Sequence, residues 1–149
     1  LETPGHTSAG LTYRAGDFLF TGDTLFLDSV GRPDLEARGD REEARRHAGL
    51  LFHSLSRLLS LDDGITVLPA HTSEPVDFDG EPVAAPLADV RERITATEQD
   101  EDEFVRELVD GIPATPPNYE RIVDLNERGE LPEEGLVDLE AGANRCAVS

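Results

Sequence analysis

The chain has 149 residues, 38% of them hydrophobic, which is enough for one domain with its own core. Its 32 acidic residues outnumber 13 basic ones, all of them Arg, and the formal net charge is −19. The sequence offers no basic stripe to neutralise phosphates, so no nucleic-acid partner is expected. No apolar run approaches the roughly 18 residues that cross a bilayer, so no membrane role is expected either.

The acidic residues are spread along the whole chain and do not form a tail. Self-repulsion at this density is tolerable where salt screens it, because the Debye length falls to about 3 Å at 1 M salt. The charge therefore predicts a halophilic protein. The single cysteine, Cys146, cannot form an internal disulfide, which favours a reducing, cytoplasmic location. We expect its thiol to be inert.

The first forty residues predict a β-hairpin followed by a loop. Two short apolar runs, residues 11–14 and 17–21, flank Ala15-Gly16, which is a hairpin signal. Residues 27–39 contain Gly31, Pro33 and Gly39 and are predicted to form a loop.

A helix is predicted to begin at Asp40, because Glu43 follows three residues later in a capping-box-like pattern. Apolar residues then recur at helical spacing as far as Leu58, and residues 62–64 end the helix. His47 and His53 lie on this helix without a motif around them and are predicted to be surface or edge residues. Residues 65–68 predict a short buried strand that Pro69 closes.

The C-terminal half predicts two amphipathic helices. Residues 72–86 are rich in Pro, Gly and Asp and predict a loop with room for a small hairpin. Apolar residues at helical spacing mark helices around 104–112 and 119–126. Gly129 ends the second helix, and we expect residues 1–129 to form the domain and residues 130–149 a loose polar tail.

Three residues of the types that bind metal ions lie just after turns or predicted strands. His6 follows a Pro-Gly turn, and Asp23 and His71 each follow a predicted strand. Side chains that leave the ends of neighbouring strands can converge on one edge of a sheet. Two imidazoles and one carboxylate suit a site that holds one metal ion or bridges two.

Three segments around these residues resemble successive motifs of the metallo-β-lactamase superfamily. They are Thr3-Pro4-Gly5-His6-Thr7, Phe20-Thr21-Gly22-Asp23-Thr24-Leu25 and Leu68-Pro69-Ala70-His71. The resemblance is to the subgroup of persulfide dioxygenases and hydroxyacylglutathione hydrolases, and residues 100–126 resemble bacterial and archaeal members. With the charge, this implies a halophilic archaeal source. It also implies an α/β fold, specifically the C-terminal half of an αββα sandwich.

By this resemblance His6 corresponds to the family's third ligand histidine, Asp23 to its shared aspartate and His71 to its last histidine. The family's first motif, His-x-His-x-Asp-His, is absent from the chain. We expect that motif, and the other half of the sandwich, in an N-terminal portion outside this sequence. The chain alone is therefore not expected to hold metal tightly.

The resemblance leaves two chemistries open. A persulfide dioxygenase would use Fe(II) to oxidise a thiol persulfide to sulfite, with His6 and Asp23 as two of three ligands and His71 near the metal without binding it. A hydroxyacylglutathione hydrolase would use two Zn(II)-like ions on a thioester, with Asp23 bridging and His71 on the second ion. In a third reading, the chain is an inactive split module that needs its N-terminal half; a homo-oligomer is also open.

Arg32 is the candidate substrate-binding residue. The segment Val30-Gly31-Arg32-Pro33-Asp34 resembles the Gly-Arg-x-Asp stretch of persulfide dioxygenases, and an arginine fork can grip a carboxylate. A loop arginine paired with Asp34 is the alternative. The stretch after His71 lacks the aromatic residue that hydrolases place there. Both features favour the iron-dependent dioxygenase.

Overall fold

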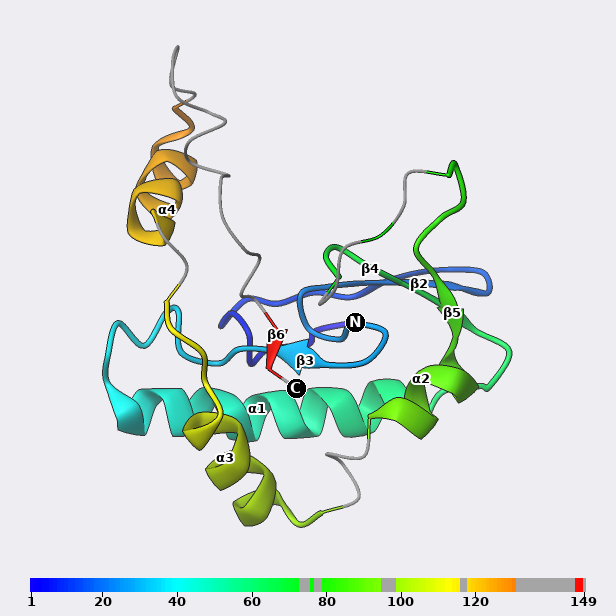
Figure 1. The fold of residues 1–149 in the computed structure, drawn as a ribbon, viewed down its shortest axis with the longest axis horizontal. Coiled ribbons are helices and arrows are strands. Elements are labelled where there is room, and N and C mark those ends of the chain that lie inside the picture. Colours follow the sequence, from blue (N-terminus) through cyan, green and yellow to red (C-terminus); the bar gives the residue numbers. More distant parts are fainter. Residues whose placement is uncertain (73–75, 77–78, 95–98, 116–117, 131–146, 149) are drawn as a thin grey trace.

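The computed structural model describes residues 1–72, 76, 79–94, 99–115, 118–130 and 147–148, with the backbone alone at 126, 127 and 147. Its main sheet has four strands in the order β1-β2-β4-β5 (Figure 1). These are β1 (Tyr13–Ala15), β2 (Phe18–Gly22), β4 (Thr66–Pro69) and β5 (Ala85–Pro86). β2 runs parallel to β4, and the other two neighbouring pairs are antiparallel.

The predicted hairpin is confirmed, with its turn one residue later than expected. β1 and β2 pair antiparallel, with Tyr13 opposite Phe20. Gly16 supplies the turn with φ +60°, a conformation that other residues adopt at a cost. Leu11, predicted within the first strand, makes only an isolated bridge to Glu2.

Helix α1 (Arg41–Leu59) connects β2 to the parallel strand β4 and packs along one face of the sheet (Figure 1). Its buried residues recur at i+3 and i+4, the spacing of one helical face. From the sheet, Leu19 and Val67 face this helix layer and are fully buried. The buried α1 residues are Ala44, His47, Ala48, Leu51, Ser54, Leu55, Leu58 and Leu59.

The start of α1 is fixed by Asp40, whose side chain accepts hydrogen bonds from the backbone N–H groups of Glu42 and Glu43. We expect Asp40→Ala to lower the free energy of unfolding by about 1 kcal/mol, because two N–H groups lose their acceptor. Asp40→Asn keeps a capping oxygen and should unfold like the wild type. Urea denaturation measures both; equal stability of the Ala and Asn variants would contradict the capping role.

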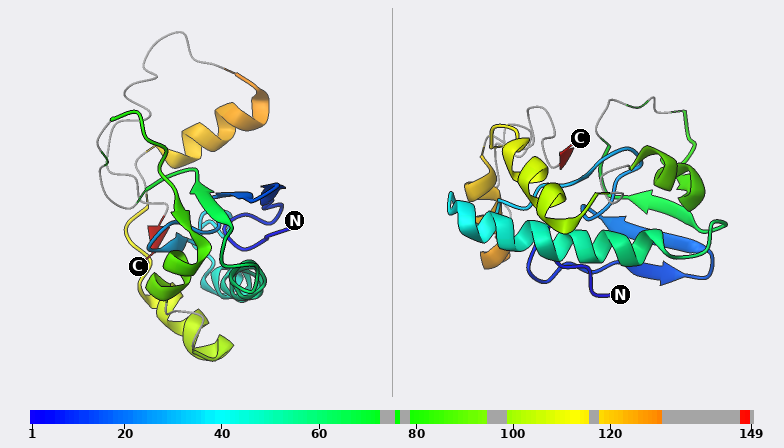
Figure 2. Two further views of the ribbon diagram at one scale, coloured as in Figure 1. Left: turned by 90° about the vertical axis from the view of Figure 1, so that its right-hand side faces the viewer. Right: turned by 90° about the horizontal axis from the view of Figure 1, so that it is seen from below.

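The helices that follow α1 in the described residues do not form one layer, since α3 (Glu101–Asp110) is the one that packs closely on α1 (Figure 2). α2 (Leu87–Arg93) was not predicted, because seven residues are too few to show a helical period. α3 (Glu101–Asp110) packs on α1, with the rings of Phe52 and Phe104 5.3 Å apart. α4 (Tyr119–Arg128) matches the second predicted helix.

A second, two-stranded sheet corrects two predictions. β3 (Val30–Gly31) lies in the stretch predicted as loop and pairs antiparallel with β6 (Ala147–Val148). Val148 is buried, so the end of the predicted loose tail returns to the fold. Two-residue strands carry too little pattern to be found in a sequence. The rest of the predicted tail, including Cys146, lies outside the described residues.

The prediction that His47 lies at the surface is wrong. Its side chain is only 2% exposed, because it lies on the apolar face of α1. Its Nδ1 lies 3.2 Å from the carbonyl oxygen of Pro33, and its Nε2 lies 3.4 Å from Glu43 Oε1. His53, by contrast, is exposed as predicted and pairs with Glu101.

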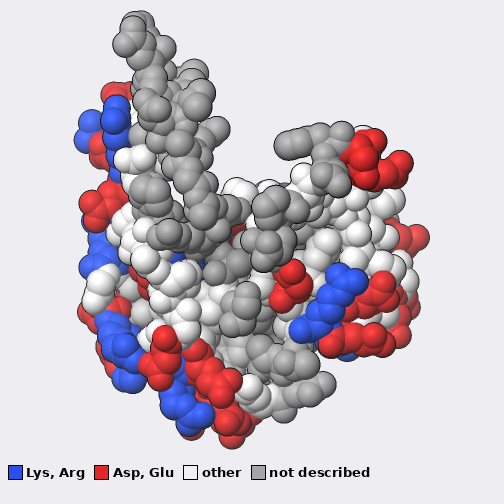
Figure 3. Space-filling model, in the orientation of Figure 1, with Lys and Arg blue, Asp and Glu red and all other residues white. Residues whose placement is uncertain are grey.

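Charged side chains gather at the margins of the molecule. Acidic and basic residues lie side by side over the start of α1 and over α3 (Figure 3). Several of them form ion pairs, such as Arg46 with Glu43 and Arg106 with Glu103. In the described residues no helix combines the length and apolarity that a membrane span requires.

Candidate metal centre

The loop that carries His6 is pressed directly onto α1. Gly5 has φ +139°, and a Cβ atom there would come within 2.5 Å of the backbone of Leu51. Glycine is therefore required at this position, both for its conformation and for the close approach. The contact places His6 at a fixed height above the helix.

The imidazole of His6 is oriented by a backbone carbonyl. Its Nδ1–H donates to the carbonyl oxygen of Arg32 at 2.8 Å. Because a carbonyl only accepts hydrogen bonds, the proton sits on Nδ1, and Nε2 of the neutral ring keeps its lone pair. Nε2 faces Asp23 Oδ2 at 3.7 Å. A donated bond from the second ring nitrogen is the usual support of a metal-binding histidine.

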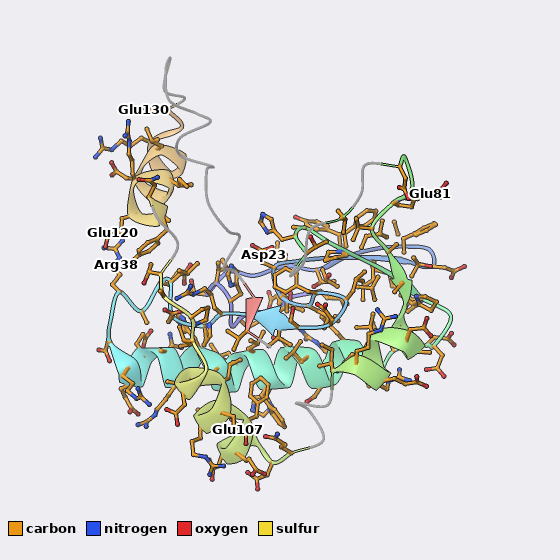
Figure 4. The ribbon with its side chains drawn as sticks, in the orientation of Figure 1. Asp23, Arg38, Glu81, Glu107, Glu120 and Glu130 are labelled. Atoms are coloured by element: carbon orange, nitrogen blue, oxygen red, sulfur yellow. The ribbon has the colours of Figure 1, made fainter. Side chains whose placement is uncertain are left out.

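Asp23 stands in the turn that follows β2, above β3 near the middle of the molecule (Figure 4). Gly22 gives this turn its φ of +55°. The Thr21 hydroxyl donates to the carbonyl oxygen of Leu25 at 2.6 Å and holds the turn in shape. The Asp23 side chain is 17% exposed, so its carboxylate can reach a small ligand.

His71 follows β4, the neighbour of β2, and reaches the same carboxylate. Its Nδ1 lies 2.6 Å from Asp23 Oδ1, while His6 faces the other carboxylate oxygen. This hydrogen bond raises the pKa of His71, and partial burial opposes the rise. The predicted convergence of His6, Asp23 and His71 at one sheet edge therefore exists in the structure.

The separation of His6 and Asp23 suits two ligands of one metal ion better than the separation of His71 and Asp23 does. Two ligands about 2.1 Å from an ion stand about 3.0–3.6 Å apart at bond angles of roughly 90–120°. The separation of 3.7 Å between His6 Nε2 and Asp23 Oδ2 is close to this range. His71 Nδ1 instead makes a direct hydrogen bond to Asp23. In the described part of the chain, no three His, Cys, Asp or Glu side chains form a set that could hold a metal.

Arg32 is buried and held by the protein. Its guanidinium makes a two-pronged bond to Asp34, at 2.7 and 2.9 Å, and its side chain is 0% exposed. It also donates to the carbonyl oxygens of Pro113 and Ala114 beyond α3. This is the alternative considered from the sequence, a loop arginine paired with Asp34. A substrate contact would require the Arg32 side chain to leave these partners.

A cavity of about 200 Å³ lies away from these residues, between β3, β6 and α3. Its lining mixes apolar side chains with a few polar ones, and none of the four candidate site residues belongs to it. It is therefore distinct from the candidate metal centre. The lining includes Val30, Arg93, Ile94, Phe104, Leu108 and Val148.

Comparisons with known proteins relate this chain to metallo-beta-lactamases. The sequence model of the Metallo-beta-lactamase superfamily matches residues 1–71, the stretch that ends at His71. The metallo-beta-lactamase superfamily is thereby supported for this chain. ETHE1 from Myxococcus xanthus has a similar structure, with a TM-score of 0.55 and 29% identity over 98% of this chain and 52% of that one. A metallo-beta-lactamase from Staphylococcus aureus also has a similar structure, with a TM-score of 0.73 and 24% identity. The match covers 90% of this chain and 41% of the Staphylococcus aureus chain.

Curated relatives match a similar share of the chain. A probable polyketide biosynthesis zinc-dependent hydrolase of Bacillus velezensis is 38% identical over 71 residues, 47% of this chain and 28% of that protein. A hydroxyacylglutathione hydrolase of Tolumonas auensis is 39% identical over 70 residues, which are 47% of this chain and 23% of that protein. An uncharacterized protein of Mycobacterium tuberculosis is 40% identical over 77 residues, with 47% of this chain and 31% of that protein covered. The chain thus matches less than a third of each of these relatives, and its mixed α/β fold resembles metallo-beta-lactamase folds.

The sequence predicted the candidate metal ligands but not the hydrogen-bonding groups that orient them. The Arg32 carbonyl and the buried polar residues of α1 carry no motif. One signal was present: His47 and Ser54 share the helix face of Leu51 and Leu58, where apolar residues are the rule.

Proposed function

We propose that this chain forms part of a metal-dependent enzyme that oxidises a thiol persulfide to sulfite and uses Fe(II). The observation that carries this choice is the division of roles around Asp23. His6 turns a lone-pair nitrogen toward one carboxylate oxygen, and His71 is hydrogen-bonded to the other. His6 and Asp23 are then ligands, and His71 orients the carboxylate without binding the metal.

Bound Fe(II) with open positions would supply the chemistry of dioxygen activation. The chain's own contribution is geometric. The Arg32 carbonyl accepts the Nδ1–H of His6, so that in the neutral imidazole Nε2 carries the lone pair, and His71 holds one carboxylate oxygen of Asp23 so that the other faces His6. In the overall reaction, a persulfide, dioxygen and water give a thiol, sulfite and protons. The similarity to ETHE1 fits this reading.

The second candidate is a two-zinc thioesterase, which the hydroxyacylglutathione hydrolase and the zinc-dependent hydrolase among the relatives support. In that enzyme Asp23 would bridge two ions and His71 would bind the second. His71 is half-exposed, so it could turn toward an ion. Its present hydrogen bond to Asp23 favours the first candidate.

Further ligands must come from outside the described residues, and the sheet indicates where a completing segment would pack. On the face away from α1, Tyr13, Phe18 and Phe20 are 66%, 51% and 46% exposed, and Tyr13 lies opposite Phe20. Such a row of aromatic residues is a surface for another layer. We propose that an N-terminal half of an αββα sandwich covers it. Submicromolar metal binding by the 149-residue chain alone would contradict this arrangement.

The assay that tests the function uses the full-length protein, this chain together with its proposed N-terminal half, purified in molar salt because a halophilic origin is proposed. About one iron per chain, with oxygen uptake that depends on a glutathione or small-thiol persulfide, would support the dioxygenase. Two zinc ions per chain with thioester hydrolysis and no oxygen uptake would contradict it.

Variants of two candidate-site histidines and one control histidine make this assay more specific. We expect His6→Ala to lose the metal and the activity, because it removes a ligand. His71→Ala should keep the iron and lose about 10-fold in rate, as is typical when the hydrogen-bond partner of a ligand is removed. His53→Ala is the matched control, since His53 is exposed and pairs with Glu101 on the helix surface. A metal content halved by His71→Ala would favour the two-zinc enzyme.

A further inference from the structure

Helix α1 presents two buried polar side chains, His47 and Ser54, on its sheet-facing side. They are 2% and 3% exposed and stand seven residues apart, which is two turns of the helix. Between them, Leu51 is the residue against which Gly5 packs. Buried polar side chains on an apolar face need hydrogen-bond partners, so their partners show what they hold.

Each side chain has as a partner the carbonyl of a proline in a loop that belongs to the candidate site, and His47 Nε2 also lies 3.4 Å from Glu43 Oε1 within α1. The Ser54 hydroxyl donates to the Pro4 oxygen at 2.7 Å, and His47 Nδ1–H donates to the Pro33 oxygen at 3.2 Å. Pro4 lies two residues before His6, and Pro33 directly follows the residue whose carbonyl orients His6. Because proline fixes φ near −65°, a held carbonyl leaves its neighbours little freedom.

The two loops meet at the His6 ring. One carries the imidazole, and the other supplies the Arg32 carbonyl that accepts its Nδ1–H at 2.8 Å. The second loop is also held from its other side, where the Arg32 guanidinium binds Asp34 and the carbonyl oxygen of Pro113. A shift of either loop relative to α1 would lengthen the bond that fixes the tautomer and direction of His6.

From these contacts we propose that His47 and Ser54 are positioning residues of the metal centre, through which α1 sets the orientation of His6 toward Asp23. The inference rests on the proposed role of His6 as a metal ligand. Neither residue touches the metal site itself. Each acts through a backbone carbonyl, one on the loop that carries the ligand and one on the loop that orients it.

The test compares Ser54→Ala and His47→Leu with two controls on the same helix. Ser56→Ala removes a hydroxyl that bonds only within the helix, to Phe52, and His53→Ala removes an exposed histidine. His47→Asn serves as a rescue variant, because its amide N–H can replace the Nδ1–H donor. Affinity for Zn(II), measured by competition with a chelator, and the ¹⁵N-correlated signal of His6 Nδ1–H in the metal-free protein are the two readouts.

We expect Ser54→Ala and His47→Leu each to lower the affinity for Zn(II) about 10-fold, the size typical of losing a residue that orients a ligand. The His6 Nδ1–H signal should broaden or exchange faster in both variants, and His47→Asn should recover most of the loss. The controls should match the wild type in both readouts.

Unchanged Zn(II) affinity and an unchanged His6 signal in Ser54→Ala and His47→Leu would overturn the proposal, even if both variants melted at lower temperature. That pattern would mean that the two residues only stabilise the fold. These measurements use the protein that carries both this chain and its proposed N-terminal half. If that wild-type protein bound no Zn(II), the proposed function would fail, and the His6 signal of the metal-free protein would still decide the positioning role.

Discussion

Replacing Asp34 with Ala is expected to lower the free energy of unfolding by about 3–5 kcal/mol. The reason is the burial of Arg32, whose guanidinium is 0% exposed and bonds both oxygens of Asp34. Removing one partner of a buried pair leaves an uncompensated charge away from water. Chemical denaturation in constant salt measures the loss.

Asp110→Ala is the matched control for this prediction. Asp110 pairs with Arg41, and both side chains are more than half exposed. An exposed ion pair contributes about 0–1 kcal/mol, because water and salt screen it. Similar losses in the two variants would show that Arg32 is solvated in solution and free to contact a substrate, as the sequence first suggested.

Replacing Gly31 with Ala is expected to cost about 3 kcal/mol of stability and to abolish metal binding. A Cβ atom at this position would stand 1.9 Å from the backbone oxygen of Asp23 and 3.0 Å from the Cβ of His6. Neither contact involves a flexible side-chain end, so both candidate ligands must move. Denaturation and metal analysis of the purified variant measure the two effects.

Gly16→Ala separates this steric effect from the general cost of losing a glycine. Gly16 has φ +60° in the hairpin turn, and a Cβ there would meet nothing within 4 Å. Its replacement should cost about 1 kcal/mol from backbone strain alone and leave metal binding intact. Metal binding that survives in Gly31→Ala would contradict the close packing of β3 against the site.

The sequence predicted the elements that carry a clear local pattern. The hairpin, α1 with its Asp40 cap, the β4 strand and the helices α3 and α4 were found, because the strands are apolar runs bounded by Gly or Pro and the helices have apolar residues at helical spacing. β3, β5, β6 and α2 were missed. Two-residue strands and a seven-residue helix exist through tertiary contacts that no local pattern encodes.

The sequence identified the candidate metal ligands but not the groups that hold them in place. The sequence predicted that His6, Asp23 and His71 converge at one sheet edge, and in the structure both histidines lie beside the Asp23 carboxylate. Their role as metal ligands stays a prediction. What the sequence could not show is that Arg32 contributes its backbone to His6 while its side chain is buried against Asp34. Backbone carbonyls carry no residue identity, so their role appears only when the loops are placed in space.

The most direct test of the central claim is a crystal structure of the full-length protein, this chain with its proposed N-terminal half, with anomalous diffraction recorded at the iron and zinc edges. We predict one peak at the iron edge, about 2.0–2.2 Å from His6 Nε2 and from the Asp23 carboxylate, with His71 still hydrogen-bonded to Asp23. A map without a metal at His6 and Asp23, or with His6 Nε2 bonded only to protein, would contradict the account.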